Sequence, residues 1–277
     1  MATSVALLSG GVGGAKLALG FYRAMDPAGL TVIANSGDDI ELFGLRICPD
    51  ADILTYTLAG QVARRQGWGI AGDSFRTLDR VRELGGTGWF NLGDVDLGLH
   101  LFRSELMAQG IGLARVTQRV AQAVGLTCRV LPMTESYAPT LIHSDQGVMH
   151  LQEYLVRHRT EPVVSKVDLS AATRARPAPG VLDALQTAEL IVLAPSNPLI
   201  SIAPILAVAG VRRHLAASKA LRVAVCPLVA GKSLKGPTDK MLWQLGQEVS
   251  PITIARLYQD VIDLFVLDEV DRRYERE

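Results

Sequence analysis

Short apolar runs alternate with helical patterns near both ends of the chain. Residues 4–8 and 30–34 are short apolar runs, and residues 15–25 between them carry apolar side chains at helical spacing. Two further apolar runs follow at 190–193 and 221–225. Strands that alternate with helices usually pair into parallel sheets, so this order predicts an α/β, Rossmann-like fold. We expect a mostly parallel sheet with helices on both faces.

The middle of the chain has a different pattern. Helical spacing dominates four stretches, at residues 53–66, 74–84, 97–109 and 113–124. Strand-like runs return at 128–131, 140–143, 148–156 and 265–267. No linker or internal repeat divides the sequence. We therefore expect a single α/β domain over residues 1–277, with a largely helical insertion at approximately 50–125.

Composition excludes several classes of protein. Hydrophobic residues make up 48% of the chain and charged residues 20%, which excludes a disordered protein. Lys plus Arg and Asp plus Glu number 28 each, so no global positive field attracts nucleic acid. No apolar run reaches the roughly 18 residues of a membrane helix. Cys48, Cys128 and Cys226 form no close pair, which favours a reduced, cytoplasmic protein.

A glycine cluster at residues 10–14 lies between the first predicted strand and helix. Glycines there let backbone amides approach an anion at a helix N-terminus, so we expect Gly11, Gly13 and Gly14 to bind phosphate. The dinucleotide fingerprint and the P-loop both fit the cluster poorly, because Lys16 stands where the fingerprint needs its third glycine. A tight turn without a ligand is the alternative.

Aspartates occur as three close pairs in predicted loops. Such hard oxygen ligands suit Mg²⁺, which typically takes one or two carboxylates and leaves positions for water and phosphate. Helix capping is the alternative for the second and third pairs. The three pairs are Asp38 and Asp39, Asp50 and Asp52, and Asp94 and Asp96.

Two later loops offer groups for a nucleotide. Ser196 and Asn197 follow the strand at 190–193, so their side chains should reach the same crevice as the glycine cluster, although turn chemistry also explains them. Lys235 lies in a glycine-rich loop and could neutralise phosphate charge, although loop lysines are usually only solvated. The histidines show no metal-ligand spacing and read as structural.

Taken together, these motifs resemble one family, the 2-phospho-L-lactate transferases that build the phosphodiester of coenzyme F420. The resemblance runs in one order from residue 5 to about 271. It rests on GGVGGAKL (10–17), NSGDD (35–39), CPDADILTYTL (48–58), LGDVD (92–96), PSNPLISI (195–202) and KGPTDK (235–240).

The resemblance implies a reaction. A phospho-acid group, of the 2-phospholactate or phosphoenolpyruvate type, would pass from a guanosine diphosphate-linked donor to the hydroxyl of the deazaflavin Fo. GMP would leave, and coenzyme F420-0 or its dehydro form would result. The family's metal is Mg²⁺, and its deazaflavin contacts carry over to Asp50 and Asn91. Val95 and the stretch 134–136 depart from the family's usual motifs, which puts fine substrate selection in doubt.

Such a transfer needs charge neutralisation and in-line positioning more than a protein nucleophile, and the aspartates and glycines described above suit this need. We expect Mg²⁺ on the Asp38/Asp39 and Asp94/Asp96 groups, with Asp38 and Asp94 catalytic through it. Asp50 would orient the Fo hydroxyl or accept its proton. A homodimer is a further expectation, which the sequence does not decide.

Two rival functions stay open from sequence alone. The first is a non-enzymatic, nucleotide-sugar-binding regulatory protein of the gluconeogenesis-factor type, which Fo binding would exclude. The second is an NAD-dependent oxidoreductase, which is disfavoured because Asn35 stands where an acidic residue should close the second strand.

Overall fold

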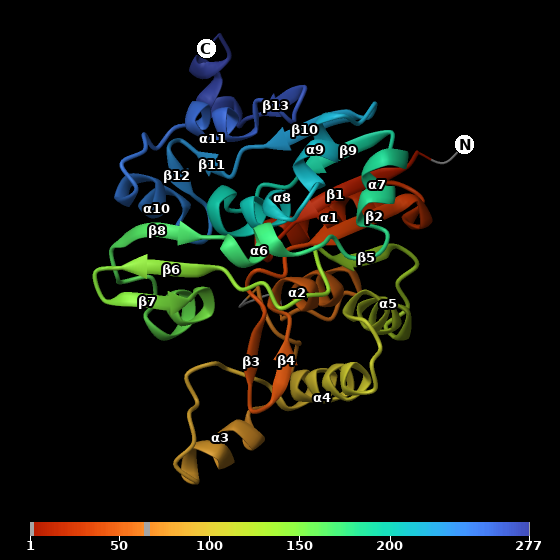
Figure 1. The fold of residues 1–277 in the computed structure, drawn as a ribbon, viewed down its shortest axis with the longest axis vertical. Coiled ribbons are helices and arrows are strands. Elements are labelled where there is room, and N and C mark those ends of the chain that lie inside the picture. The colour runs from red at the N-terminus through yellow and green to blue at the C-terminus, as the bar shows by residue number, and fades with distance from the viewer. Residues whose placement is uncertain (1–2, 64–66, 277) are drawn as a thin grey trace.

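The computed structural model describes residues 3–63 and 67–276. A six-stranded sheet, parallel throughout, forms its centre, with the strand order β13-β10-β9-β1-β2-β5 (Figure 1). The strands are β1 (Val5–Ser9), β2 (Leu30–Ala34), β5 (Arg129–Pro132), β9 (Leu190–Leu193), β10 (Leu221–Val225) and β13 (Leu264–Val266). The predicted α/β fold with a parallel sheet is confirmed.

Helices cover both faces of this sheet because its central strands are apolar on both sides. In β1, Val5 and Leu7 pack with α1, α2 and α5, whereas Ala6 and Leu8 pack with α7, α8, α9 and α11. The first group comprises α1 (Gly11–Ala24), α2 (Pro49–Leu58) and α5 (Leu113–Ala123). The second comprises α7 (Val181–Thr187), α8 (Ala203–Ala207), α9 (Val211–Ala216) and α11 (Pro251–Tyr258).

Smaller elements surround the sheet. Strands β6 (Leu141–Ser144), β7 (Gly147–His150) and β8 (Val164–Asp168) form an antiparallel sheet, and β3 (Ile40–Leu42) pairs with β4 (Leu45–Ile47) in a hairpin. Short elements also include α6 (Ser170–Arg174), α10 (Thr238–Gln244), β11 (Leu228–Val229) and β12 (Lys232–Ser233). Short 3₁₀ helices lie at Pro27–Gly29 and Glu269–Tyr274, and a π-helical turn lies at Pro198–Ile202. The strand predicted at 148–156 ends at His150, and a π-helical turn follows at Glu153–Arg157.

Four helices lie between β4 and β5, within the segment predicted as helical. The helices α2 and α5 contact the sheet, whereas α3 (Arg76–Glu83) and α4 (Asp94–Ala108) lie with the β3–β4 hairpin below it in Figure 1. The helix predicted at 53–66 corresponds to α2, which starts earlier and ends at Leu58; residues 64–66 lie outside the described part of the chain. No helix in residues 3–63 and 67–276 is long and apolar enough to cross a membrane.

The chain reverses its direction of travel across the sheet at β1. From β1 it proceeds to β2 and β5 on one side, and later to β9, β10 and β13 on the other. In open α/β sheets, the crevice outside the carboxyl ends of the two strands at such a switch point is the usual ligand site. We therefore expect the ligand site at the loops that follow β1 and β9.

Two glycines of α1 provide a matched test of how tightly this region packs. A Cβ at Gly13 would lie 2.8 Å from the backbone oxygen of Pro195, whereas one at Gly20 would meet nothing within 4 Å. We expect Gly13→Ala to lower the free energy of unfolding by about 1–3 kcal/mol through overpacking. Gly20→Ala should raise it by up to about 1 kcal/mol, since alanine favours a helix. Urea unfolding measures both, and equal effects would contradict the packing assignment.

Candidate functional site

The loops after β1 and β9 meet directly. Ser196 Oγ donates a 2.6 Å hydrogen bond to the Gly10 carbonyl and accepts one of 3.3 Å from the Gly10 amide. A Cβ at Gly14 would lie 2.6 Å from Ser196 Oγ. The glycine cluster is thus the first turn of α1 rather than a loop before it, because α1 begins at Gly11. Gly13 and Gly14 allow close packing, whereas Gly11 has a φ of +64° and open space around its Cα.

Asp50 connects α2 to the N-terminus of α1. Its Oδ1 accepts a 2.6 Å hydrogen bond from the Gly11 amide, and its Oδ2 accepts one of 2.9 Å from Asn35 Nδ2. The idea that Asp50 caps its own helix is therefore wrong. Burial raises the pKa of Asp50 to about 6, against the lowering effect of the bonds from Asn35 and Gly11. Asp50 thus places a carboxylate at the positive end of the α1 dipole.

Asp38 is buried beside Asp50 without full compensation. Its Oδ2 accepts a 3.0 Å hydrogen bond from Gln152 Nε2, but its Oδ1 has no partner among the described residues. Burial, and then repulsion from Asp50 and Asp39, hold the pKa of Asp38 well above its ordinary value. A cation near Oδ1 would relieve this repulsion, since buried charges are normally paired or coordinate metals.

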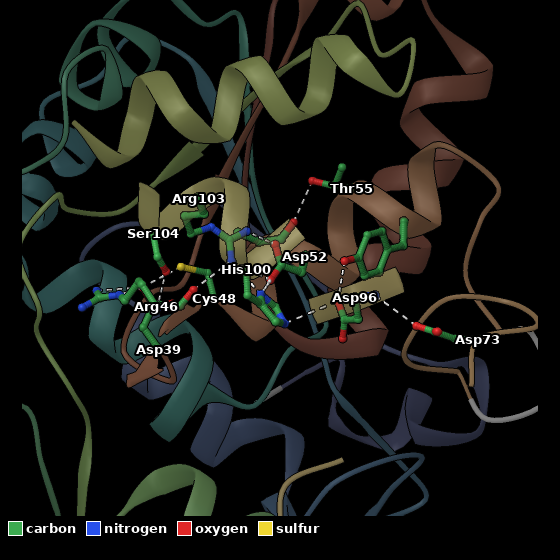
Figure 2. Close-up of polar contacts among 12 residues, drawn as sticks. Asp39, Arg46, Cys48, Asp52, Thr55, Asp73, Asp96, His100, Arg103 and Ser104 are labelled. Atoms are coloured by element: carbon green, nitrogen blue, oxygen red, sulfur yellow. Dashed lines mark hydrogen bonds and ion pairs between the residues drawn. The ribbon is translucent and has the colours of Figure 1, made fainter. Parts of the chain in front are cut away.

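Asp39 already has a positive partner. Its Oδ2 accepts hydrogen bonds from Arg46 Nη2 at 2.8 Å and from Cys48 Sγ at 3.2 Å (Figure 2). Burial raises the pKa of Asp39 to about 6 although Arg46 favours its charged form. His150 Nε2 also contacts the Asp39 backbone oxygen at 3.0 Å. These contacts fix the turn that presents Asp38.

Asp94 and Asp73 cap each other's helices. Asp94, the first residue of α4, accepts from Ser74 Oγ and from the Thr77 amide (2.9 Å) at the start of α3. Asp73 accepts from the amides of Val95 (2.9 Å) and Asp96 (3.1 Å) at the start of α4. The hydrogen bond from Ser74 and those from the α3 terminus lower the pKa of Asp94 to about 2. The idea that Asp96 caps the helix beginning near Leu97 is therefore wrong. Asp94 is the capping residue of this pair, and it caps α3.

Asp96 belongs to a buried polar network inside the helical segment. Its Oδ1 accepts a 2.5 Å hydrogen bond from the Tyr56 hydroxyl and lies 3.5 Å from His100 Nε2. Arg103 is paired with Asp52 and contacts His100, as Figure 2 shows. His100 and Arg103 are each 1% exposed. Sequence reasoning treated His100 as structural; its place one helical turn after Asp96 was the available signal.

A cavity of about 610 Å³ lies beside this network. The aromatic side chains Tyr56, Trp68 and Phe90 line it together with aliphatic groups of α2. Asn91 lines it as well, and its Oδ1 accepts a 3.2 Å hydrogen bond from Arg82. Its polar walls also include Asp52, Asp96, His100 and Gln152. We call it the aromatic cavity. Gln152 lines this cavity and donates a hydrogen bond to Asp38, so a single side chain connects the cavity wall to the Asp38 carboxylate.

The two remaining predicted residues flank the crevice. Asn197 Oδ1 accepts hydrogen bonds from the amides of Leu199 (2.9 Å) and Ile200 (3.3 Å), so it caps the turn after β9. A Cβ at Gly67 would lie 2.7 Å from Lys235 Nζ and 3.6 Å from Val12, which places the lysine near the first turn of α1. The structure thus brings Gly11, Asp38, Asp50, Ser196 and Lys235 to one end of the sheet. It places Asn91 and Asp96 at the aromatic cavity, and Asp94 at the junction of α3 and α4.

Comparison with known proteins identifies the family. The model of the family described as 2-phospho-L-lactate transferase CofD matches residues 5–277. The chain belongs to this family of transferases. It is 37% identical over 273 residues to a phosphoenolpyruvate transferase of Streptomyces griseus, covering 96% of this chain and 86% of that protein. It is 36% identical over 266 residues to a 2-phospho-L-lactate transferase of Methanosarcina mazei, covering 96% and 87%.

Solved structures agree on the fold. Two crystal structures of one Bacillus halodurans protein, described as a member of the UPF0052 family, match this chain. One has a TM-score of 0.63 with 17% identity, covering 100% of this chain and 86% of that one. The other has a TM-score of 0.57 with 18% identity, covering 82% and 69%. At this identity the likeness concerns the fold alone.

The uncompensated charge on Asp38 predicts a gain in stability when that charge is removed. The native state holds a proton on Asp38 that the unfolded chain releases near its ordinary pKa of 3.8. The wild-type protein therefore loses stability as the pH rises from about 4 through the raised folded pKa. Without metal at pH 8, Asp38→Asn should be more stable by roughly 1–3 kcal/mol. At pH 5 the gain in the free energy of unfolding from Asp38→Asn should be smaller. A less stable variant at pH 8 would refute this electrostatic account.

Proposed function

We propose that this protein transfers a phospho-acid group from a guanosine diphosphate-linked donor to the hydroxyl of the deazaflavin Fo. GMP is released, and coenzyme F420-0 or its dehydro form is the product. The observation that carries the proposal is the aromatic cavity, which Gln152 joins to the Asp38 carboxylate, a close neighbour of the Asp50 carboxylate that contacts α1. An aromatic acceptor and a diphosphate donor can then meet at one place.

The aromatic cavity fits the acceptor. A deazaflavin is a flat ring system with one apolar face on each side and polar atoms along its edges. Tyr56, Trp68 and Phe90 offer surfaces for the faces, and Asn91 offers an amide for an edge. This wall arises from segments far apart in sequence, namely α2, the residues around Trp68 and the stretch before α4.

The crevice at α1 fits the donor's diphosphate. The N-terminus of a helix attracts anions, and Gly11 leaves open space there for close approach. Lys235 lies near Val12 and adds a positive charge, and Ser196 and Asn197 shape the facing loop. We assign the phosphates of the donor to this crevice.

Mg²⁺ fits Asp38 better than the other predicted ligands. Asp38 Oδ1 is buried without a partner in the described part of the chain, and the pKa of Asp38 is raised by burial and by neighbouring carboxylates. Asp39 is neutralised by Arg46, and both oxygens of Asp94 accept hydrogen bonds from α3. When bound, Mg²⁺ would neutralise charge on the diphosphate. Asp38 would hold it, while donor phosphates and water would complete its ligands.

Asp50 is the residue that we assign to the acceptor hydroxyl. Its pKa of about 6 leaves it ionised at neutral pH yet basic enough to accept a proton as the oxygen attacks phosphorus. The bonds from Gly11 and Asn35 hold its carboxylate in one orientation, which favours positioning.

The direct test is product formation. Incubation with Fo, Mg²⁺ and 2-phospholactate-type or phosphoenolpyruvate-type guanosine donors should yield GMP and the matching F420-0 species by mass spectrometry. EDTA should stop turnover, and Asp38→Asn should lower it by at least about 10–100-fold. Asp94→Ala is the matched control, which should melt earlier but keep its activity and its Mg²⁺ requirement. Absence of Fo binding and of product would refute the proposal and favour a regulatory nucleotide-sugar-binding protein.

A further inference from the structure

His100 is a buried histidine in the wall of the aromatic cavity. The residue lies on α4, is 1% exposed and lines the cavity wall. Its Nε2 has no hydrogen-bond partner among the described residues. A buried polar atom without a partner is costly and uncommon in folded proteins, so this nitrogen indicates a ligand contact.

The neighbours of His100 determine which nitrogen carries the proton. Arg103 Nη1 lies 3.2 Å from His100 Nδ1, and a guanidinium can only donate. Nδ1 therefore accepts, and the neutral ring carries its hydrogen on Nε2. Arg103 itself is held by Asp52 and by the Arg46 carbonyl at 3.3 Å. This arrangement favours the tautomer that carries its proton on Nε2.

Asp96 is the acceptor nearest to this donor, but it lies at ion-pair distance. Its Oδ1 lies 3.5 Å from His100 Nε2, which is longer than a well-formed N–H···O bond. The same oxygen accepts the Tyr56 hydroxyl at 2.5 Å. Asp96 and Tyr56 thus form their own pair next to His100, and both line the aromatic cavity. The Nε2–H group therefore makes no well-formed hydrogen bond within the described residues.

We propose that His100 Nε2–H donates to an acceptor atom on the edge of the ring system bound in the aromatic cavity, and so selects rings that present an acceptor there. The inference rests on the proposed function, which puts Fo in this cavity. The pyrimidinedione part of a deazaflavin offers carbonyl oxygens and a ring nitrogen as acceptors. A buried donor rejects a ring without a matching acceptor more strongly than an apolar wall would.

A purely structural role makes a different prediction. If His100 only supports Arg103, its replacement should lower stability while Fo affinity in the folded protein stays unchanged. If it binds the ring, the dissociation constant and the KM for Fo should rise, while the KM for the guanosine donor stays the same. The two roles therefore separate in binding measurements.

The wild-type protein allows the first measurement. In protein with ¹⁵N-labelled histidine, NMR should show His100 protonated on Nε2 and not on Nδ1. Saturating Fo should move the Nε2–H resonance, whereas guanosine diphosphate alone should leave it in place. Fo that binds without moving this resonance would overturn the inference but not the proposed function. Failure of Fo to bind would instead refute the proposed function.

Two substitutions of His100 distinguish the loss of a hydrogen-bond donor from a change in the shape of the side chain. The His100→Asn side chain keeps an acceptor for Arg103 near the position of Nδ1, but it is too short to place a donor at the position of Nε2. The longer His100→Gln side chain can place its amide donor at that position. By calorimetry, His100→Asn should bind Fo about tenfold more weakly, and His100→Gln should bind within about threefold of wild type. His143→Asn, on β6 and outside the cavity lining, is the matched control and should bind normally.

The variants overturn the inference in two ways. Wild-type affinity in His100→Asn would show that the donor is not used. Equal weakening in both variants would show that the imidazole acts through its shape. If a variant melts below the assay temperature, the NMR measurement on wild-type protein decides alone.

Discussion

The carboxylate of Asp50 at the first amide of α1 is the contact on which the arrangement of the site depends. It joins α2 to α1 and, through Asn35, to the end of β2. A carboxylate in this place is favoured by the helix dipole. It also brings a negative charge next to Asp38, which is 4% exposed and has one oxygen without a partner in residues 3–63 and 67–276. The contact that organises the crevice therefore also adds to the uncompensated negative charge around Asp38.

The unfavourable burial of negative charge is concentrated at Asp38. Asp39 and Asp52 lie nearby, but each has an arginine, Arg46 and Arg103 respectively. Among the residues that the structure describes, the Asp38 side chain has only the amide of Gln152 as a hydrogen-bond donor. Natural proteins tolerate such uncompensated groups chiefly at functional sites, where they bind what the protein itself does not supply. Gln152 links Asp38 to the aromatic cavity, because it donates to the Asp38 carboxylate and lines the cavity wall.

Much of the fold could be predicted from the sequence, because apolar runs and helical spacing are local signals. The six central strands lie within about two residues of the predicted runs. The site was harder because its contacts are long-range. Asp50 caps a helix that starts 39 residues earlier, and Asp94 and Asp73 cap each other's helices across 20 or so residues. No local pattern distinguishes such a carboxylate from a metal ligand or from a cap of its own helix.

The location of the metal tests the account most directly. Crystals soaked with Mn²⁺ in place of Mg²⁺, together with guanosine diphosphate, can be examined at the manganese absorption edge. We expect one anomalous peak within coordination distance of Asp38 Oδ1, and no peak between Asp94 and Asp96. A peak at Asp94 and Asp96 with none at Asp38 would contradict the claim that the buried charge of Asp38 is the metal site.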